Sequence, residues 1–460
     1  MGVCVYCAGT KFTPHRRMSA MYVCTIQVDP LLQENTILVP NFIIKQEQLI
    51  PHEYTLKLGL EEKVAFIDKV QDSNNTRTVI VSQEIASSLR LPKNNIKLQL
   101  SITNDRSTFC FGPVFMIWTD YKAHHLESSF FQFCKEVALA GEKKGVFTYI
   151  QVKGQEEGFI LQDGWWQKHS PLPIPDVIYN RIHSRKFEAH PTFQKNKKGW
   201  ETASFFNDHF INKWQSHEWL YANEKVRDHL PETNLLTSEN ILPILSTHPT
   251  VYTKPINGSQ GRGIFVVERV IDQGFWIYPA AKEKEEAIWC PSENLLLSFV
   301  EKISANQPYI VQQALSLCKA EDGLVDFRFL VHYYDHKWNV TSSVARIGEP
   351  NRIISNQAQG GQIATPLDVL KNWFPTDFKK MYADMILISK EIATTIVEES
   401  DGQFAELGLD LAIDTTGHIW LLEVNSKPSK TAPIREDILI RPSASALCKV
   451  CLDFYKRNNP

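Results

Sequence analysis

The spacing of apolar and polar residues changes twice along this chain. From about residue 24 to residue 102, short β-like runs alternate with polar turns, and residues 97–102 alternate strictly between polar and apolar side chains. The next part holds an apolar run at 109–118, a helical pattern at 126–140 and a strand pattern at 146–152. The order strand, helix, strand predicts a βαβ crossover in a parallel sheet.

Proline punctuation marks the end of the second part. Residues 170–175 read Ser-Pro-Leu-Pro-Ile-Pro, and a lysine-rich connection follows them. These residues predict a loop-rich boundary. Because 460 residues are enough for several domains, we expect a β-rich domain at 1–105, a βαβ domain at 106–199 and a third domain at 200–460.

Two helices are predicted in the third part. Phe206, Phe210 and Trp214 recur at four-residue spacing, which predicts one face of a helix that carries Lys213 on a neighbouring face. A longer apolar stripe at residues 378–396 predicts an amphipathic helix. We interpret that stripe as core packing and not as a cofactor site.

The charge balance excludes two classes of partner. With 49 basic and 52 acidic residues, the formal net charge is -3, so the chain has no bulk attraction to nucleic acid or to an anionic membrane. Its apolar runs are far shorter than the ~18–20 residues of a spanning helix. We therefore expect no nucleic-acid partner, no membrane span and a cytoplasmic location.

Nine cysteines spread thinly over the chain fit reduced thiols better than a disulfide framework. The residue types and the Cys-x-x-Cys start of a zinc site occur near the beginning, in Cys4, Cys7, His15 and Cys24. This segment has no clear periodicity, and Met18 and Met21 follow closely. We prefer a leader upstream of a later start, and both alternatives stay open for residues 1–20.

A glycine-rich loop joins two predicted strands. Residues 250–256 form a strand pattern that contains Lys254. Three glycines follow this strand, Gly258, Gly261 and Gly263, and a second strand pattern then spans 264–270. A Rossmann or P-loop glycine turn would instead lead into a helix. We interpret the loop as a flexible hairpin whose N–H groups fold over phosphates, backed by the lysine, with a plain hairpin as the alternative.

A second hairpin is predicted where apolar runs at 409–413 and 418–425 flank the turn-rich tetrad Asp414-Thr415-Thr416-Gly417. If Ile413 pairs with His418, Asp410 lies opposite Leu421, and Glu423 and Asn425 continue along the same face. The opposite, apolar face then carries Leu409, Leu411, Leu422 and Val424.

The predicted polar face has the chemistry of a metal site. Asp410, Glu423 and Asn425 offer hard oxygen ligands, which suit Mg²⁺ because this ion takes its remaining ligands from water and substrate phosphates. A solvated strand face could also hold acidic residues. Since Glu423 and Asn425 lie in an otherwise apolar strand, where unpaired polar groups cost free energy, we prefer the metal site.

Several motifs together resemble a known family. In order they are Lys254 with the glycine loop, Asp326-Phe327-Arg328, Arg346, residues 356–361, and Asp410 with Glu423-Val424-Asn425. They look like the ordered motifs of ATP-grasp proteins, and the whole chain is similar to the YheC/YheD group of spore-forming bacilli, described as endospore coat-associated. The resemblance implies an α+β fold: a two-lobe ATP-grasp domain that binds Mg-ATP, preceded by a small βαβ (pre-ATP-grasp) domain and an N-terminal β-rich domain.

The resemblance also implies roles for the nucleotide-binding residues. Lys213 and Lys254 would contact the ATP phosphates, and Gly258, Gly261 and Gly263 would form a flexible lid. Gln312 and Gln313 match the strand between the lobes that meets adenine. Many ATP-grasp enzymes have a glutamate near that point, so the adenine and ribose contacts stay open.

The remaining roles concern the reacting phosphate. Arg328 and Arg346 match the arginines that hold the transferred phosphate or an acyl phosphate, a task that suits a planar guanidinium fork. Asp410, Glu423 and Asn425 match the metal ligands, so the implied cofactors are ATP and Mg²⁺.

Two functions from different classes fit these residues. One is an ATP-dependent carboxylate-amine or carboxylate-thiol ligase that acts on a small-molecule or peptide carboxylate through an acyl phosphate. The other is a structural protein of the spore coat that binds ATP without turnover and has coat proteins as partners. The set of lysines, arginines and metal ligands favours the ligase. The residues name neither the acid nor the nucleophile.

Overall fold

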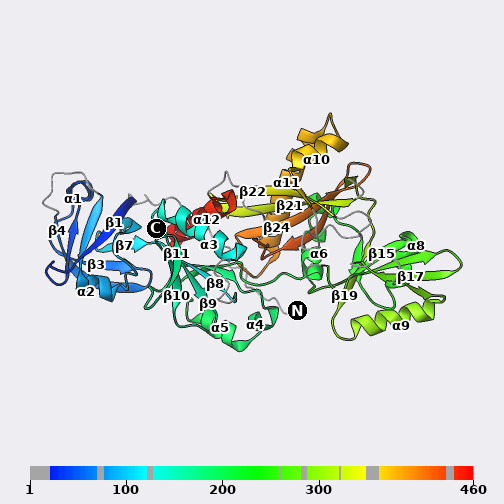
Figure 1. Cartoon of the computed structure of the whole chain (residues 1–460), viewed down its shortest axis with the longest axis horizontal. Coiled ribbons are helices and arrows are strands. Elements are labelled where there is room, and N and C mark those ends of the chain that lie inside the picture. Colours follow the sequence, from blue (N-terminus) through cyan, green and yellow to red (C-terminus); the bar gives the residue numbers. More distant parts are fainter. Residues whose placement is uncertain are drawn as a thin grey trace, which may run out of the picture.

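The computed structural model describes residues 21–69, 77–121, 128–258, 261–280, 287–320, 323–348, 362–430 and 440–458. A closed barrel and three open sheets follow one another along an elongated molecule (Figure 1). Helices and strands are mixed throughout, as predicted for an α+β protein. The division into domains at residues 105 and 199 stays a prediction.

The barrel lies at one end of the molecule (Figure 1). Its strands are β1 (Tyr22–Asp29), β2 (Thr36–Val39), β3 (Glu53–Leu58), β4 (Glu61–Lys69), β5 (Thr78–Ser82), β6 (Ile96–Ile102) and β7 (Thr108–Gly112), with helices α1 (Asn41–Glu47) and α2 (Gln83–Ser88) between them. Alternate side chains of β1 point inward, among them Cys24, which is 1% exposed. The other members of the zinc hypothesis, Cys4, Cys7 and His15, lie outside the described residues.

The middle sheet contains the predicted βαβ unit. Its strands are β8 (Val114–Thr119), β9 (Phe147–Val152), β10 (Gly158–Gln162), β11 (Trp165–His169), β12 (Val177–Arg181) and β13 (Ser204–Phe206), with helices α3 (Ser129–Glu142), α4 (Arg185–Glu188) and α5 (Pro191–Lys198). β8 and β9 pair in parallel across α3, which confirms the crossover. The apolar run at 109–118, however, is two strands: Pro113 separates β7 in the barrel from β8 here, because proline has no N–H to donate to a ladder.

The last helix, α12 (Pro442–Asn458), returns to this middle sheet. It lies beside α3 (Figure 1), and its buried Leu447, Cys448 and Cys451 join the same core as Phe131 and Ile150. The chain therefore leaves the middle sheet and comes back to it after the two remaining sheets.

The third and fourth sheets carry the predicted nucleotide-binding motifs. The third consists of β14 (Thr233–Leu235), β15 (Thr250–Pro255), β16 (Phe265–Val270), β17 (Gly274–Pro279), β18 (Ile288–Cys290) and β19 (Tyr309–Gln313), with α8 (Ile241–Thr247) and α9 (Glu293–Ser304). The fourth consists of β20 (Lys319–Ala320), β21 (Gly323–Tyr334), β22 (Lys337–Ile347), β23 (Gln362–Ala364), β24 (Glu406–Ile413) and β25 (Ile419–Asn425), with α6 (Lys213–Ala222), α7 (Glu224–Arg227), α10 (Pro366–Trp373) and α11 (Phe378–Glu399).

The long helix α11 is the one predicted from the apolar stripe. Met385, Ile392 and Ile396 on that stripe are buried against the fourth sheet, so the stripe is core packing. The other predicted helix is wrong. Phe206 ends β13, where it pairs with Tyr179, and α6 begins only at Lys213.

The start of α6 has a local cause. The Oδ1 atom of Asn212 accepts a hydrogen bond from the N–H of Gln215 at 2.8 Å, which caps the helix at this point. The four-residue spacing of the aromatic residues before it therefore arises from a strand end and a loop, and not from a helical turn.

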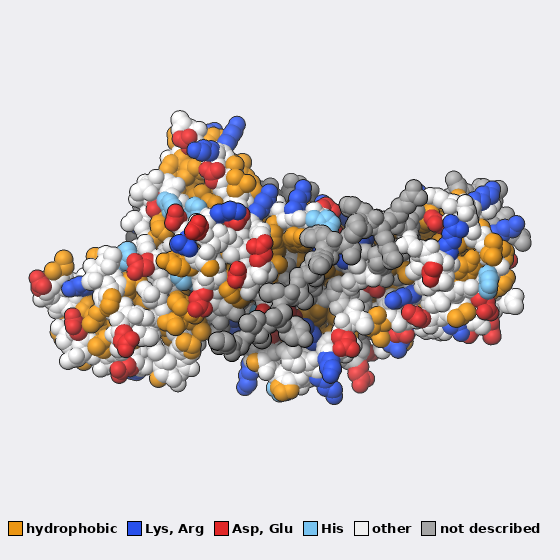
Figure 2. All heavy atoms as spheres, turned by 180° about the vertical axis from the view of Figure 1, so that it is seen from behind, with side chains coloured by type: hydrophobic (Ala, Val, Ile, Leu, Met, Phe, Trp, Pro, Cys, Tyr) orange, Lys and Arg blue, Asp and Glu red, His pale blue; other side chains and the backbone are white. Residues whose placement is uncertain are grey.

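The surface agrees with a small net charge. Figure 2 shows acidic and basic side chains interspersed over the described part of one face. No helix among the described residues has both the length and the apolar character that crossing a membrane requires.

Candidate functional site

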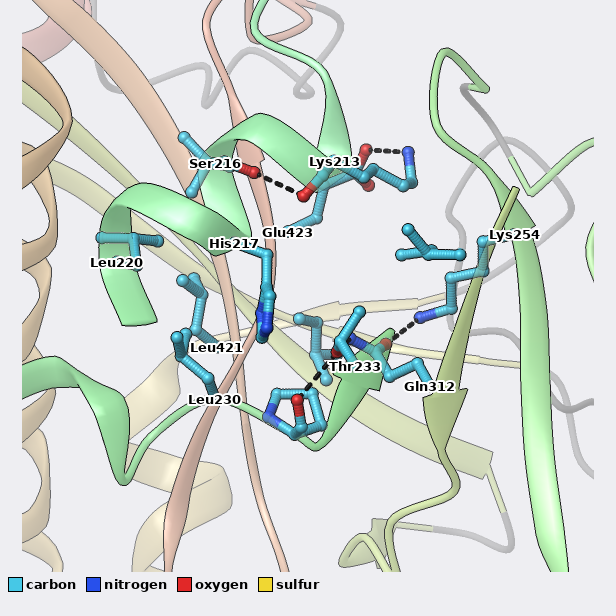
Figure 3. A pocket seen from close by; sticks show the side chains of 14 residues that line it. Lys213, Ser216, His217, Leu220, Leu230, Thr233, Lys254, Gln312, Leu421 and Glu423 are labelled. Carbon is cyan, nitrogen blue, oxygen red and sulfur yellow. Dashed lines mark hydrogen bonds and ion pairs between the residues drawn. The ribbon is translucent and has the colours of Figure 1, made fainter. Parts of the chain in front are cut away.

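A pocket lies between the third sheet and the hairpin of β24 and β25 (Figure 3). Its apolar wall includes Leu220, Leu230, Ile310, Leu421 and Leu422. The polar residues that line it are Lys213, Ser216, His217, Thr233, Lys254, Gln312 and Glu423. Predicted site residues from four separate segments therefore meet in one cavity. The predicted Gln313 is not among the described residues that line it; its Oε1 accepts from the N–H of Glu232 at 2.7 Å.

Lys213 enters the pocket from the first turn of α6. Its Nζ donates to Glu423 Oε1 at 2.8 Å and to the carbonyl oxygen of Gly258 at 2.8 Å. The lysine thus joins the metal-candidate strand β25 to the start of the glycine hairpin. An ammonium in this place can reach an anion that lies between the two.

Lys254 is held by a short chain of hydrogen bonds. Its Nζ donates to Gln312 Oε1 at 2.6 Å, and Gln312 Nε2 donates to Thr233 Oγ1 at 2.9 Å. Thr233 donates in turn to the carbonyl oxygen of Pro231 at 2.8 Å, so its hydroxyl is oriented to accept from the amide. Burial, with a smaller contribution from Lys213, lowers the pKa of Lys254 to about 8.

The glycine segment forms the predicted antiparallel hairpin between β15 and β16. Residues 259 and 260 lie outside the described residues. Gly261 has φ +71° and Gly263 has φ +72°, a left-handed backbone that favours glycine. A residue with a side chain would be strained at either position, which is a conformational reason for glycine to occupy both.

β24 and β25 form the predicted antiparallel hairpin, but with a different register. Ile413 pairs with Ile419 and Leu411 with Leu421, after which the register shifts so that Asp410 lies opposite Glu423. The predicted pairing of Asp410 with Leu421 is therefore wrong. Part of the difference lies at the turn, where Ile413 pairs with Ile419 and not with His418. The rest comes from a β-bulge that inserts Leu422, because one extra residue offsets all pairs beyond it.

The bulge keeps the three polar residues together. Asn425 Nδ2 donates to Asp410 Oδ2 at 3.3 Å, and Glu423 is the cross-strand neighbour of Asp410. On the apolar face, Leu411 pairs with Leu421 and not with the predicted Leu422. Both Leu421 and Leu422 line the pocket.

Two guanidinium groups surround Asp410. Arg328, from β21, donates through Nε to Asp410 Oδ1 and through Nη2 to Oδ2 at 2.9 Å. Arg346, from β22, lies with Nη2 3.0 Å from Asp410 Oδ1 and also bonds Asp326. Burial alone would raise the pKa of Asp410, but the two arginines hold it below its ordinary value. Asp410 therefore stays charged at the centre of the cluster.

The donor set fits one class of metal. Among the described residues, no three His, Cys, Asp or Glu side chains are grouped as metal ligands. A cation on this face would thus rest on two carboxylates and one amide oxygen. Such a small set of oxygen donors matches Mg²⁺, which keeps waters and takes phosphate oxygens. The motif at residues 356–361 lies outside the described residues.

Two polar residues of the pocket, Thr233 and His217, were not predicted from the sequence. Figure 3 shows His217 extending from α6 into the pocket, and burial lowers its pKa, which keeps the ring neutral at pH 7. Each is a single polar residue in an unremarkable stretch. No spacing signal could have found either one, since each lines the pocket together with residues that lie far away in the sequence.

Comparisons with known proteins complete the description. Residues 202–452 match the family model described as YheC/D like ATP-grasp. The chain is 27% identical to the endospore coat-associated protein YheD of Bacillus subtilis (strain 168) over 417 residues, which are 86% of this chain and 88% of that protein. It is 26% identical to the endospore coat-associated protein YheC of the same strain over 276 residues, 57% of this chain and 73% of that protein. Among solved structures it is similar to D-alanyl-alanine synthetase A from Vibrio cholerae, with 12% identity, a TM-score of 0.46, and coverage of 75% of this chain and 98% of that one.

Proposed function

The chain belongs to the YheC/D-like ATP-grasp family, and on that premise we propose that it is an ATP-dependent carboxylate ligase. The observation that carries this proposal is the convergence of cations and oxygen donors at one cleft. Lys213 and Lys254 line the pocket with Glu423. Glu423 is the cross-strand neighbour of Asp410, which binds Arg328 and Arg346.

The two ends of the pocket suit the two ends of ATP. The base would lie against the apolar wall near Leu230 and Leu421, with His217 and Thr233 as polar neighbours. The phosphates would lie toward Lys213, Lys254 and the glycine hairpin, whose backbone N–H groups can donate to them. Asp410, Glu423 and Asn425 would hold Mg²⁺, which when bound supplies charge neutralisation for the phosphates.

The chemistry requires no nucleophilic side chain. A carboxylate oxygen of the acid forms a bond to the γ-phosphorus while the bond from that phosphorus to ADP breaks. An amine or thiol then attacks the acyl carbon, phosphate leaves, and the nucleophile loses its proton. Arg328 and Arg346 would hold the transferred phosphoryl group; their carboxylate partners fix both planar forks in advance.

The test is formation of ADP and phosphate by the full chain with Mg-ATP, across panels of carboxylic acids and amines. We expect release that depends on both added substrates and that disappears in Arg328→Met. Nucleotide binding with no release under any pair would contradict the ligase.

A second function has support of its own. The relatives YheD and YheC are named as endospore coat-associated, which supports a spore-associated protein that binds ATP without turnover and contacts coat proteins. Binding of Mg-ATP without acid-dependent ADP release would favour this alternative. The location we propose is accordingly the cytoplasm, with association to the spore.

A further inference from the structure

Arg185 extends from the middle part of the chain to the nucleotide-binding hairpin. It is the first residue of α4, which follows β12 of the middle sheet. Its Nη1 donates to Asn257 Oδ1 at 3.4 Å, at the start of the glycine hairpin. Residue 185 lies outside the family match at 202–452. A charged group from outside the ATP-binding segment therefore borders the proposed phosphate site.

The backbone around Arg185 is firmly held. Asp120, after β8, accepts from the N–H of His183 and from the N–H of Ser184, each at 2.9 Å. Ser184 Oγ accepts from the N–H of Phe187 at 3.2 Å and caps α4. The guanidinium, with its centre 4.2 Å from the ring of Phe210, is therefore carried by an ordered support.

The charge of Arg185 is poorly compensated. Among the ion pairs of the described residues, Glu188 pairs with Lys427 and Glu423 pairs with Lys213. In this part of the structure, Arg185 has no carboxylate within ion-pair distance. Burial lowers the pKa of Arg185, and the more distant charges of Glu188 and Glu423 oppose this shift without cancelling it. The side chain is partly exposed, so an anion from solvent can reach it.

We propose that Arg185 binds a second negative group of the acid substrate, so that this chain acts on dicarboxylates or comparable diacids. The proposal rests on the ligase function above, in which Arg328 and Arg346 serve the reacting end. Hydrogen bonds connect the two places. Arg185 bonds Asn257, and the carbonyl oxygen of the next residue, Gly258, accepts from Lys213 Nζ. Lys213 also bonds Glu423, the cross-strand neighbour of Asp410. A planar fork suits bidentate carboxylate binding, and Lys213 and Lys254 already serve the nucleotide side.

The test is calorimetric binding of small acids to the full chain saturated with Mg-AMPPNP, an ATP analogue that is not hydrolysed. The probes are succinate, glutarate, L-aspartate and L-glutamate, each compared with butyrate, valerate or L-alanine. We expect the parent to bind at least one diacid about tenfold or more tightly than its monoacid counterpart. Arg185→Met should abolish this preference, and Arg185→Lys should restore part of it.

The neighbouring Lys186 provides the matched control, because it is exposed on the same short helix. Lys186→Met should keep the diacid preference, and affinities for Mg-ADP and Mg-AMPPNP should stay within about twofold of the parent in all three variants. A parent that binds nucleotide but prefers no diacid overturns the proposal, as does an unchanged preference in Arg185→Met. Selective loss of AMPPNP over ADP affinity in Arg185→Met would make it a γ-phosphate residue instead. Failure of the parent to bind nucleotide would overturn the proposed ligase itself.

Discussion

The buried ammonium of Lys254 predicts a pH-dependent affinity for ATP. This side chain lines the pocket and is oriented by Gln312, which Thr233 orients in turn. Only its protonated form attracts phosphate. Because burial lowers its pKa to about 8, the lysine should lose its proton within a pH range in which the folded protein can be studied.

The size of the effect follows from that pKa. At a pKa of about 8, about nine-tenths of the molecules carry the proton at pH 7 and about one-tenth at pH 9. ATP affinity should therefore fall about tenfold over this interval, or ~1.4 kcal/mol. Lys254→Ala should bind ATP roughly 10- to 100-fold more weakly at pH 7, the range for losing one hydrogen bond to a charged group.

The free energy of unfolding should change with pH in the direction opposite to the affinity for ATP. The folded pKa of about 8 lies below the ordinary 10.5, so between these values the unfolded chain binds a proton that the folded chain has lost. The free energy of unfolding contributed by this group therefore rises with pH across that window. Lys254→Ala should remove this contribution and leave the fold intact.

The assay is calorimetric titration of Mg-ATP at several values between pH 7 and pH 9 for the parent, Lys254→Ala and Lys254→Arg. The arginine variant stays charged throughout, so its affinity should change less than about twofold. If the parent loses no more affinity than Lys254→Arg, the ammonium does not bind phosphate and the reasoning is refuted.

Three further predictions concern the hairpins. Glu423→Gln should weaken Mg²⁺ binding in the presence of ATP and abolish turnover without unfolding the chain. The turn control Asp414→Asn should leave a Mg²⁺ titration of nucleotide binding unchanged, and identical titration curves for the two variants would contradict the metal site. A double substitution of Gly261 and Gly263 by alanine should lower nucleotide affinity in the same titration, because both glycines have a left-handed backbone. A double variant that binds nucleotide as tightly as the parent would argue against a lid. Asp410→Asn should lower the free energy of unfolding by about 1–3 kcal/mol in urea denaturation, since it removes the charge that two half-buried guanidinium groups share, of which Arg346 keeps Asp326. An unchanged free energy of unfolding would contradict this.

Local patterns predicted much of this molecule. The βαβ unit, the helix α11 and both hairpins followed from periodicity and turn residues. Each of these features is encoded within one continuous segment of the chain. The order of motifs then indicated the family, because it depends only on sequence position.

Other features depended on small local offsets. The helix α6 begins at Lys213 because Asn212 caps it, and an aromatic spacing of four residues does not reveal this. The turn pairs Ile413 with Ile419 and not with His418, and the bulge at Leu422 adds a second one-residue offset, so Asp410 lies opposite Glu423. A single inserted residue changes every pair beyond it, yet leaves the alternation of each strand nearly intact.

The site itself was decided by tertiary structure. Hydrogen bonds join Lys254, Gln312 and Thr233 on three strands, over a sequence separation of up to 79 residues. Arg185 bonds Asn257 over a separation of 72 residues. Composition and periodicity describe which side chains exist and which face they occupy. They do not specify which distant faces meet, since that choice is made by the packing of whole sheets and helices, where each contact depends on all the others.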